Sequence, residues 1–322
     1  TANYGVYAAV LKPGDKVLSM RLDQGGHLTH GSPANFLSKV YEYHFYGVNP
    51  ETEMIDYEAL EEKAKEVMPK LIIAGGSSYP RLIDYERIGQ IAKSVDAYFM
   101  VDMAHVSGLV AAGLIPSPVP YADFVTSSTT KTFCGPRSGF ILCKKEHAKL
   151  IDKGVFPGLI GSMHLTTMAA KVWSMKYAAS EEFKNIMKQV LVNAKTLAEE
   201  LTGHGFRIVS GTTDNHIVMV DLRDKGITGK LFQDALDSIG ITVNKNQIPN
   251  DPASPFVTSG VRIGVTSITQ RGLKESEVKI IADIMNQVAE APEDERNLSL
   301  CKKRAEELIA RFPLYPAGSF KD

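Results

Sequence analysis

A single lysine, Lys131, follows a row of small and hydroxyl residues in the stretch Val125–Gly139, V-T-S-S-T-T-K-T-F-C-G-P-R-S-G. The preceding residues, Asp123 to Val125, predict a buried strand, so the lysine lies at the mouth of that strand. An ammonium group withdrawn from water has a lowered pKa and presents a free amine, which a Schiff-base lysine requires. The neighbouring hydroxyls suit a phosphate or a phenolic oxygen. Taken alone, the stretch favours an ordinary surface lysine, because lysines usually lie at the surface.

An aspartate, Asp102, ends the apolar run Y-F-M-V. Its carboxylate is therefore expected at the carboxyl end of a central strand, where burial costs free energy unless the charge is paired. One interpretation is an N-cap for the segment that follows. The other is a carboxylate that pairs with a ring nitrogen and keeps that nitrogen protonated. His105, three residues on, is either a helix-start histidine bonded to backbone or a second site residue.

Two histidines, His27 and His30, lie in the glycine-rich stretch D-Q-G-G-H-L-T-H-G-S-P that begins at Asp23. Histidines three apart on a loop can ligate metal, but no Cys, Asp or Glu accompanies them at metal-ligand spacing, so we expect no metal. The pair Gly25-Gly26 allows a ligand to approach the backbone closely. It is not a G-x-G-x-x-G fingerprint, so a Rossmann nucleotide site is not supported.

An arginine, Arg262, lies inside the apolar strand pattern V-R-I-G. Such a side chain either extends to solvent or pairs with an acid, or it receives a substrate carboxylate through two parallel hydrogen bonds. Arg137, in the turn after Lys131, has the same two interpretations. A lysine, a strand-end aspartate, a loop histidine and an arginine fork together form the set that a pyridoxal phosphate enzyme uses on an amino acid.

The elements that must position these residues form an α/β pattern. Strand patterns alternate with helix patterns, which predicts a largely parallel sheet with its chemistry at the carboxyl ends of the strands. The strand patterns are Lys16–Met20, Tyr41–Val48, Lys70–Gly75 and Ala97–Asp102, and the helix patterns are Ala2–Leu11, Tyr57–Val67 and Tyr85–Val95.

From about Thr166 the pattern changes to a long helical stretch, Thr167–Thr202, interrupted near Ser180. Short strands follow, including one expected at Ile241–Val243, and then two more helices. This predicts a smaller α+β domain after a helical link. We therefore expect a large cofactor-binding domain over residues 1–180, incomplete at its N-terminus, and a small C-terminal domain over residues 181–322.

The composition is that of an ordinary globular protein, with 322 residues, 44% hydrophobic and 23% charged, and a formal net charge of −1. Near-zero charge argues against nucleic acid or a polybasic membrane contact, and no apolar run is long enough for a bilayer. The three cysteines, Cys134, Cys143 and Cys301, lack C-x-x-C spacing, which favours the reducing cytoplasm over a disulfide framework. The chain opens at Thr1 inside a helix pattern, and we expect that an N-terminal piece is missing.

Four motifs carry a resemblance to a known family. They are G-G-H-L-T-H-G-S from Gly25, V-D-M-A-H-V-S-G-L-V-A-A-G from Val101, V-N-K-N-Q-I-P-N-D from Val243 and P-F-V-T-S-G-V-R-I-G from Pro255. The chain resembles serine hydroxymethyltransferases, which are fold-type I pyridoxal phosphate enzymes. The resemblance implies a mostly parallel large domain with a smaller α+β domain. It also implies a homodimer that acts on serine and glycine with tetrahydrofolate as co-substrate.

The resemblance also implies residue roles. Lys131 would hold pyridoxal 5'-phosphate as a Schiff base, Asp102 would pair with the pyridinium nitrogen, and His27 would stack on the ring. Among the other cofactor contacts, His105 and Ser77 would lie beside the phenolic oxygen, Ser128 near the lysine, and Gly161 in a loop that reaches the neighbouring subunit's cofactor phosphate. The substrate contacts would be Arg262 for the carboxylate of serine or glycine, and Leu22, Gly26, Leu28 and Asn246 for the folate.

The chain departs from the family pattern near the cofactor. Thr130 stands where a histidine is usual, Phe133-Cys134 replaces Leu-Arg or Leu-Ala, Pro80 replaces a serine, and Gly158–Met163 replaces a Ser-x-Gln-Gly-Gly-Pro loop. The family's proton-handling glutamate and its Ser-Gly-Ser/Thr phosphate loop precede the position of Thr1. Two alternatives therefore stay open. One is a folate-independent aldolase or transaldolase on β-hydroxy amino acids, and the other is a non-catalytic paralogue that dimerises with an intact partner.

Overall fold

The computed structural model describes residues 1–315, and the chain divides into two compact units. The first unit is Thr1–Met187 and the second is Lys188–Asp322. The division falls inside helix α7 (Glu181–Gly203). The predicted domain boundary after residue 180 lies just before the first residue of this helix.

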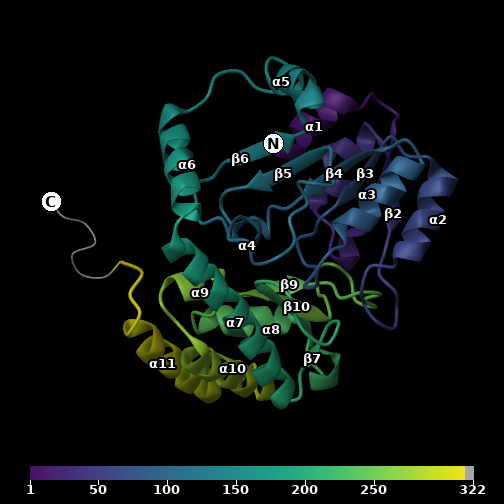
Figure 1. The fold of residues 1–322 in the computed structure, drawn as a ribbon. Helices are drawn as coiled ribbons and strands as arrows, with labels where there is room; N and C mark the ends of the chain where they lie inside the picture. The colour runs from purple at the N-terminus through teal and green to yellow at the C-terminus, as the bar shows by residue number, and fades with distance from the viewer. Residues whose placement is uncertain (316–322) are drawn as a thin grey trace. The chain divides into compact units, whose positions relative to one another are not determined.

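A six-stranded sheet forms the centre of the first unit, in the order β2-β1-β3-β4-β5-β6 (Figure 1). The strands are β1 (Lys16–Met20), β2 (Glu42–Tyr46), β3 (Leu71–Ala74), β4 (Tyr98–Asp102), β5 (Phe124–Ser128) and β6 (Gly139–Cys143). The first five are parallel to one another, and β6 runs antiparallel to β5. The predicted α/β class with a mostly parallel sheet is confirmed.

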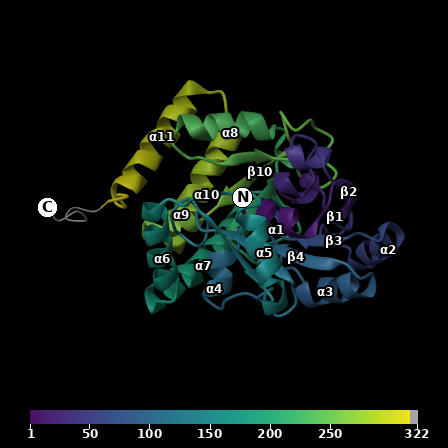
Figure 2. The same ribbon diagram turned by 90° about the horizontal axis from the view of Figure 1, so that it is seen from above.

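Helices cover both faces of this sheet, so its strands are apolar on both sides, as parallel strands usually are. The helices of the first unit are α1 (Ala2–Val10), α2 (Tyr57–Val67), α3 (Tyr85–Ser94), α4 (Ser107–Ala111), α5 (Ala148–Val155) and α6 (Leu165–Ala178). Val17, Ile73 and Met100 pack on one face in a core that α1 and α5 complete. Their strand neighbours Leu18 and Ile72 pack on the opposite face in a core with residues of α2 and α3. Figure 2 shows α1 and α5 on one side of β4 and α3 on the other.

Side-chain caps fix several helix starts. The Asp56 carboxylate accepts from the backbone N–H of Ala59 at 2.9 Å and begins α2 at the predicted residue. Asn35 accepts from the Leu37 N–H at 3.0 Å and begins a short 3₁₀ helix. The 3₁₀ helices are η1 (Leu22–Gln24), η2 (Leu28–His30), η3 (Phe36–Lys39), η4 (Lys145–His147) and η5 (Arg223–Lys225).

Strand β5 is longer than the apolar pattern predicted. The strand continues through the hydroxyl residues to Ser128, because β6 supplies an antiparallel partner along its whole length. Thr126 lies in register with Asp102 of β4. The polar residues from Thr126 to Ser128 are therefore held by the sheet, and the loop that carries Lys131 begins at Thr129.

The second unit is an α+β arrangement with an antiparallel sheet in the order β7-β8-β10-β9. The strands are β7 (Arg207–Ile208), β8 (Ile217–Asp221), β9 (Asn244–Asn246) and β10 (Gly260–Gly264), and the helices that follow α7 are α8 (Gly229–Ser238), α9 (Thr266–Gln270), α10 (Glu275–Glu290) and α11 (Glu295–Ala310). The strand predicted at Ile241–Val243 was wrong. The polar residues from Asn244 form the ladder with β10, while Val243 is buried in the core.

Two short helices, α5 and α9, were not predicted from the sequence. Neither has a side-chain cap at its start, so the local signal that marks a helix beginning is absent.

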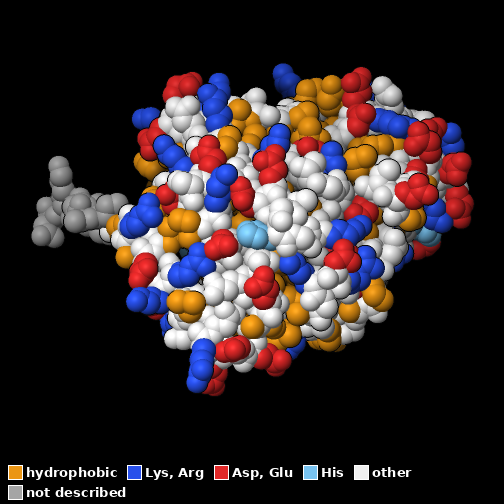
Figure 3. Space-filling model, turned by 90° about the horizontal axis from the view of Figure 1, so that it is seen from below, with side chains coloured by type: hydrophobic (Ala, Val, Ile, Leu, Met, Phe, Trp, Pro, Cys, Tyr) orange, Lys and Arg blue, Asp and Glu red, His pale blue; other side chains and the backbone are white. Residues whose placement is uncertain are grey.

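On the face drawn in Figure 3, acidic and basic side chains are interspersed with hydrophobic ones. None of the helices in the described part of the chain is long and apolar enough to cross a membrane.

Candidate active site

A pocket of about 460 Å³ opens in the first unit where the loops leave the carboxyl ends of β1, β3, β4 and β5. Parallel strands direct their carboxyl ends to one edge of a sheet, which brings residues from distant parts of the sequence together. The lining residues are Thr1, Ala2, Asn3, His27, Thr29, His30, Gly76, Ser77, Asp102, Ala104, His105, Ser127, Ser128, Thr130, Lys131, Arg137, Ser138 and Gly139.

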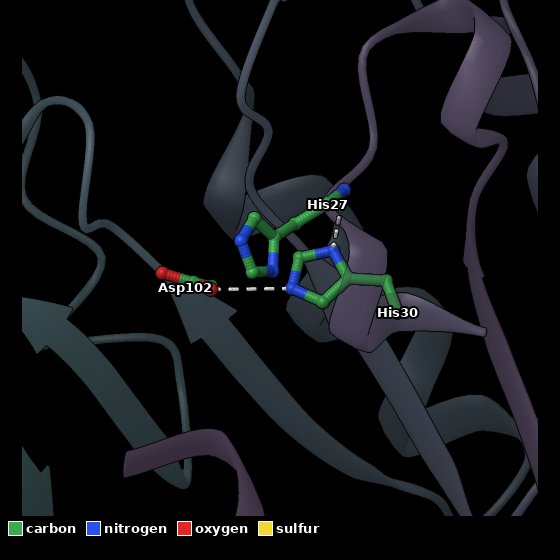
Figure 4. Close-up of side chains that lie close together, drawn as sticks. All are labelled: His27, His30 and Asp102. Carbon is green, nitrogen blue, oxygen red and sulfur yellow. Dashed lines mark hydrogen bonds and ion pairs between the residues drawn. The ribbon is translucent and has the colours of Figure 1, made fainter. Parts of the chain in front are cut away.

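The carboxylate of Asp102, the last residue of β4, accepts three hydrogen bonds. Its Oδ2 accepts from Asn3 Nδ2 at 2.7 Å and from His30 Nε2 at 3.2 Å. Its Oδ1 accepts from the backbone N–H of Ala104 at 3.0 Å. Figure 4 shows the His30 ring directed at this carboxylate, with the His27 ring alongside.

Two opposing effects set the charge of Asp102. Burial raises the pKa of the carboxyl group, but the hydrogen bonds from His30, Asn3 and the backbone of Ala104 outweigh it and hold the pKa well below its usual range. The side chain is therefore an anion at neutral pH. A buried anion that faces a pocket is suited to pair with a cationic group on a ligand.

The two histidines are close enough to Asp102 to suggest a metal site, since ligand atoms of all three lie within 4.8 Å of one another. Their hydrogen bonds argue otherwise. His27 Nδ1 accepts from the backbone N–H of Thr29 at 3.2 Å, and His30 Nδ1 accepts from the backbone N–H of His27 at 3.4 Å. Each ring then carries its proton on Nε2. A protonated nitrogen cannot ligate a metal, so this arrangement favours hydrogen bonding over coordination.

Burial, with a smaller contribution from His30, lowers the pKa of the His27 imidazole to about 4. The ring is therefore neutral at physiological pH. It packs edge-on against His30, with ring centroids 5.5 Å apart. A neutral imidazole in a pocket offers a flat face without the cost of burying a second charge.

This depressed pKa predicts that the protein loses stability as the pH falls from 6.5 toward 4. In that range the unfolded chain binds a proton on His27, whose ordinary pKa is 6.5, while the folded chain does not. Stability therefore rises with pH, by up to about 3 kcal/mol across the window. Urea unfolding at several pH values would measure this change in the free energy of unfolding. His27→Gln should lack the part of the pH dependence that comes from His27. Equal pH dependence in both proteins would contradict the assignment.

Lys131 follows β5 by three residues and is half-buried at the pocket. The hydroxyls of Ser128 and Thr130 lie beside it and are 2.8 Å apart, within hydrogen-bond distance. The next residue, Thr132, is fully buried. Its hydroxyl donates to the carbonyl of His105 at 2.8 Å and accepts from the N–H of Gly108 at 2.9 Å. The loop that carries the lysine is thus tied to the start of α4, which limits how far Lys131 can move.

The structure brings six of the seven predicted cofactor residues to this one pocket. They are His27, Ser77, Asp102, His105, Ser128 and Lys131. The seventh, Gly161, is exposed and is not among the lining residues. Of the predicted folate contacts in the first unit, Leu22 and Leu28 expose apolar side chains on η1 and η2.

Gly26 is buried, and the structure gives a reason for glycine that sequence reasoning missed. A Cβ on Gly26 would lie 2.3 Å from the carbonyl oxygen of Met20 and 2.9 Å from that of Arg21. Its neighbour Gly25 has a φ of +122°, a conformation that other residues rarely adopt. The glycine pair is therefore required by packing of the loop against β1, whatever it does for a ligand.

Gly26→Ala is expected to destabilise the protein by about 2 kcal/mol, because the added methyl group must displace backbone atoms. Chemical denaturation would measure the change in the free energy of unfolding. Gly203→Ala is the matched control, since a Cβ there meets nothing within 4 Å at the end of α7. Equal stability of the two variants would show that the loop adapts to the methyl group.

The remaining predicted substrate residues lie on the small sheet of the second unit. Arg262 occupies the centre of β10 and donates from Nη2 to Asn244 Oδ1 at 3.1 Å. Asn246 pairs in register with Gly260, two residues before the arginine. Residues two apart on a strand share a face, so Arg262, Asn244 and Asn246 lie on the same face of this sheet. Burial lowers the pKa of the Arg262 guanidinium.

Several pocket residues were missed by sequence reasoning. Asn3 was not singled out, and His30 was considered only as a metal ligand. Thr126, which bonds Asn3 from outside the pocket lining, was not singled out either. One signal was available for Asn3. It is a polar residue within the otherwise apolar first two turns of the N-terminal helix, on a turn that the structure buries.

The chain was compared with models of known protein families, and the model described as serine hydroxymethyltransferase matches residues 1–285. The chain belongs to the serine hydroxymethyltransferase family. The match includes every pocket residue and the β10 arginine, and it ends within α10. The resemblance seen in the four motifs is confirmed. This is a family of pyridoxal phosphate-dependent transferases of fold type I that exchange a one-carbon unit between serine and glycine, and the mostly parallel sheet agrees with that fold.

Proposed function

We propose that this serine hydroxymethyltransferase family member interconverts serine and glycine and passes the one-carbon unit to tetrahydrofolate. The observation that most supports the proposal is the placement of Lys131 and Asp102 at one pocket. Asp102 ends β4 and Lys131 follows the adjacent strand β5, and the neutral His27 ring lines the same pocket. A lysine amine and a buried anion at one strand edge are what pyridoxal phosphate requires.

The donor set fits pyridoxal phosphate. Lys131 would bind its aldehyde carbon, the Asp102 carboxylate would hold the proton on its ring nitrogen, and His27 would lie against its ring. His105, Ser77 and Ser128 would surround it at the pocket wall. When bound, the cofactor supplies an electron sink for the bond broken at the α-carbon of the amino acid. The protein's part is to position the groups and to keep Asp102 charged.

The substrates would meet a cation and two apolar side chains. Arg262 would bind the carboxylate of serine or glycine, since a guanidinium can donate two parallel hydrogen bonds to it. The exposed side chains of Leu22 and Leu28 would offer apolar surface to the folate ring, with Gly26 and Asn246 as further contacts. Fixing the carboxylate determines which bond at the α-carbon is held for cleavage.

The proposed assembly is a homodimer in the cytoplasm. Large apolar side chains are exposed in the segment from Phe156 to Met175, including Met163, Leu165 (77% exposed), Val172 and Trp173 (63% exposed). Exposed apolar surface on this scale is typical of an interface. The segment contains Gly161, which would then reach the phosphate of the partner's cofactor. The three cysteines form no disulfide in the described part of the chain, which suits a reducing compartment. Sedimentation velocity would give the mass of the assembly.

A second candidate is a folate-independent aldolase on β-hydroxy amino acids. The observation that favours it is the hydroxyl of Thr130, which stands just before Lys131 where the family usually carries a histidine and which pairs with the Ser128 hydroxyl. A change of the group next to the lysine alters how protons are handled there. This candidate predicts cleavage of serine with release of formaldehyde in the absence of folate.

An absorption spectrum distinguishes these candidates. Pyridoxal phosphate is added to the purified protein, followed by glycine and then tetrahydrofolate. The proposed function predicts a visible band on cofactor addition and a new long-wavelength band only when glycine and folate are both present. A glycine response without a folate effect would favour the aldolase. A band that appears only after mixing with a full-length homologue would indicate a non-catalytic subunit.

A further inference from the structure

The carboxamide of Asn3 contacts three different parts of the pocket wall. Asn3 lies in the first turn of α1 and is 7% exposed. Its Nδ2 donates to Asp102 Oδ2 at 2.7 Å and to the hydroxyl oxygen of Thr29 at 2.8 Å. Its Oδ1 accepts from the hydroxyl of Thr126 at 2.6 Å. The amide thus joins α1 to the glycine-rich loop, to β4 and to β5.

The charge of Asp102 determines which way this amide is turned. If the amide were reversed, its oxygen would lie 2.7 Å from a carboxylate oxygen, and two acceptors would face each other. The NH₂ group therefore faces Asp102. The Thr29 hydroxyl that accepts from Asn3 lies 2.8 Å from His27 Nδ1 and donates to it. Asn3 is consequently bonded to Asp102 directly and to His27 through one hydroxyl.

The two oxygens of Asp102 are used unequally. Oδ2 accepts from both Asn3 and His30, and within residues 1–315 Oδ1 accepts from the Ala104 N–H alone. A carboxylate oxygen has room for about two hydrogen bonds, so Oδ1 retains one open position. We propose that Asn3 is a positioning residue that, together with His30, saturates Oδ2 of Asp102 and reserves Oδ1 for the ring nitrogen of the cofactor. This inference rests on the proposed function.

The test compares the affinities of the full chain for two ligands. One is pyridoxal phosphate, and the other is 1-deazapyridoxal phosphate, in which a carbon replaces the ring nitrogen. Asn3→Ala is expected to weaken binding of pyridoxal phosphate at least about tenfold, because a hydrogen bond to a charged group is lost. Its affinity for the deaza analogue should stay unchanged, since that ring has no nitrogen to pair with Asp102.

Asn3→Asp is a second variant with nearly the same volume. It places two carboxylates about 2.7 Å apart, which cannot both be ionised, so the loss for pyridoxal phosphate should exceed that of Asn3→Ala. Asn35→Ala is the matched control. Asn35 also bonds a nearby element, through the Tyr4 hydroxyl at 3.0 Å and the Leu37 N–H at 3.0 Å, but it lies outside the pocket.

The outcomes separate the inference from the proposed function. The inference is supported if both Asn3 variants lose affinity for pyridoxal phosphate but not for the deaza analogue, and if Asn35→Ala keeps its affinity for both ligands. Equal losses for the two ligands would mean that Asn3 is merely structural, and would overturn the inference while leaving the proposed function intact. Failure of the unaltered protein to bind pyridoxal phosphate would overturn both.

Discussion

Lys131→Ala is expected to lower the rate at which serine is converted to glycine by about 10,000-fold, a loss typical of removing a group that reacts covalently. Among the described residues that line the pocket, Lys131 is the sole lysine, so no second lysine side chain can replace it. The loop that carries it is fixed through Thr132 to the carbonyl of His105, so another part of the chain cannot easily take its place. Glycine formation, measured by chromatography with added cofactor, gives the rate.

Lys131→Arg is the matched variant for this prediction. Arginine keeps the positive charge but offers no free amine, because its guanidinium stays protonated. The arginine variant should therefore be as inactive as the alanine variant, and both should lack the visible band that pyridoxal phosphate gives with the unaltered protein. Substantial activity in Lys131→Arg would mean that Lys131 contributes only charge.

Asp102→Asn is expected to lower the same rate by roughly two orders of magnitude, equivalent to about 3 kcal/mol, because a buried charge loses its partner. The substitution keeps the shape of the side chain and removes the anion that would hold the proton on the ring nitrogen. Affinity for pyridoxal phosphate should fall as well, while the deaza analogue should bind as before. Steady-state rates and equilibrium titrations give the two quantities.

Asp123→Asn is the control for Asp102. Asp123 is a partly buried carboxylate of the same sheet that pairs with Lys144 at 2.5 Å and accepts from the Phe99 N–H at 2.9 Å, but it does not line the pocket. This variant should lose stability and keep its rate. If both aspartate variants lost activity equally, the effect of Asp102 would be one of general stability.

The sequence predicted the end of β4 at Asp102 correctly, because its signal is local, but it placed the end of β5 too early. An apolar run that stops at Asp102, or just before the hydroxyls of β5, shows where each strand leaves the core. The rule that parallel strands expose their carboxyl ends at one edge then places Asp102, Lys131 and His105 together. Local pattern and topology were sufficient for these three residues, whereas Ser77 was expected from the family resemblance, and the structure places all four at the pocket.

The contacts between those residues could not be predicted from the sequence, because they depend on how segments far apart in the chain align with one another. The Asn3–Thr126 bond joins residues 123 positions apart, and the pairing of Thr126 with Asp102 is set by the register of β4 against β5. Nδ1 of His27 and Nδ1 of His30 each accept a backbone N–H, and both hydrogen bonds depend on the turn geometry of η2. No residue spacing in the sequence predicts these hydrogen bonds, although they determine the charge of Asp102 and the tautomers of His27 and His30.

The proposed function requires that the one-carbon unit of serine passes to folate at the pocket of Lys131. The most direct measurement is carbon NMR of the full chain, with pyridoxal phosphate, serine labelled with ¹³C at its β-carbon, and tetrahydrofolate. We expect the label to appear on the folate, at a rate that requires both folate and Lys131. Release of the label as formaldehyde at the same rate without folate, or transfer undiminished in Lys131→Ala, would contradict it.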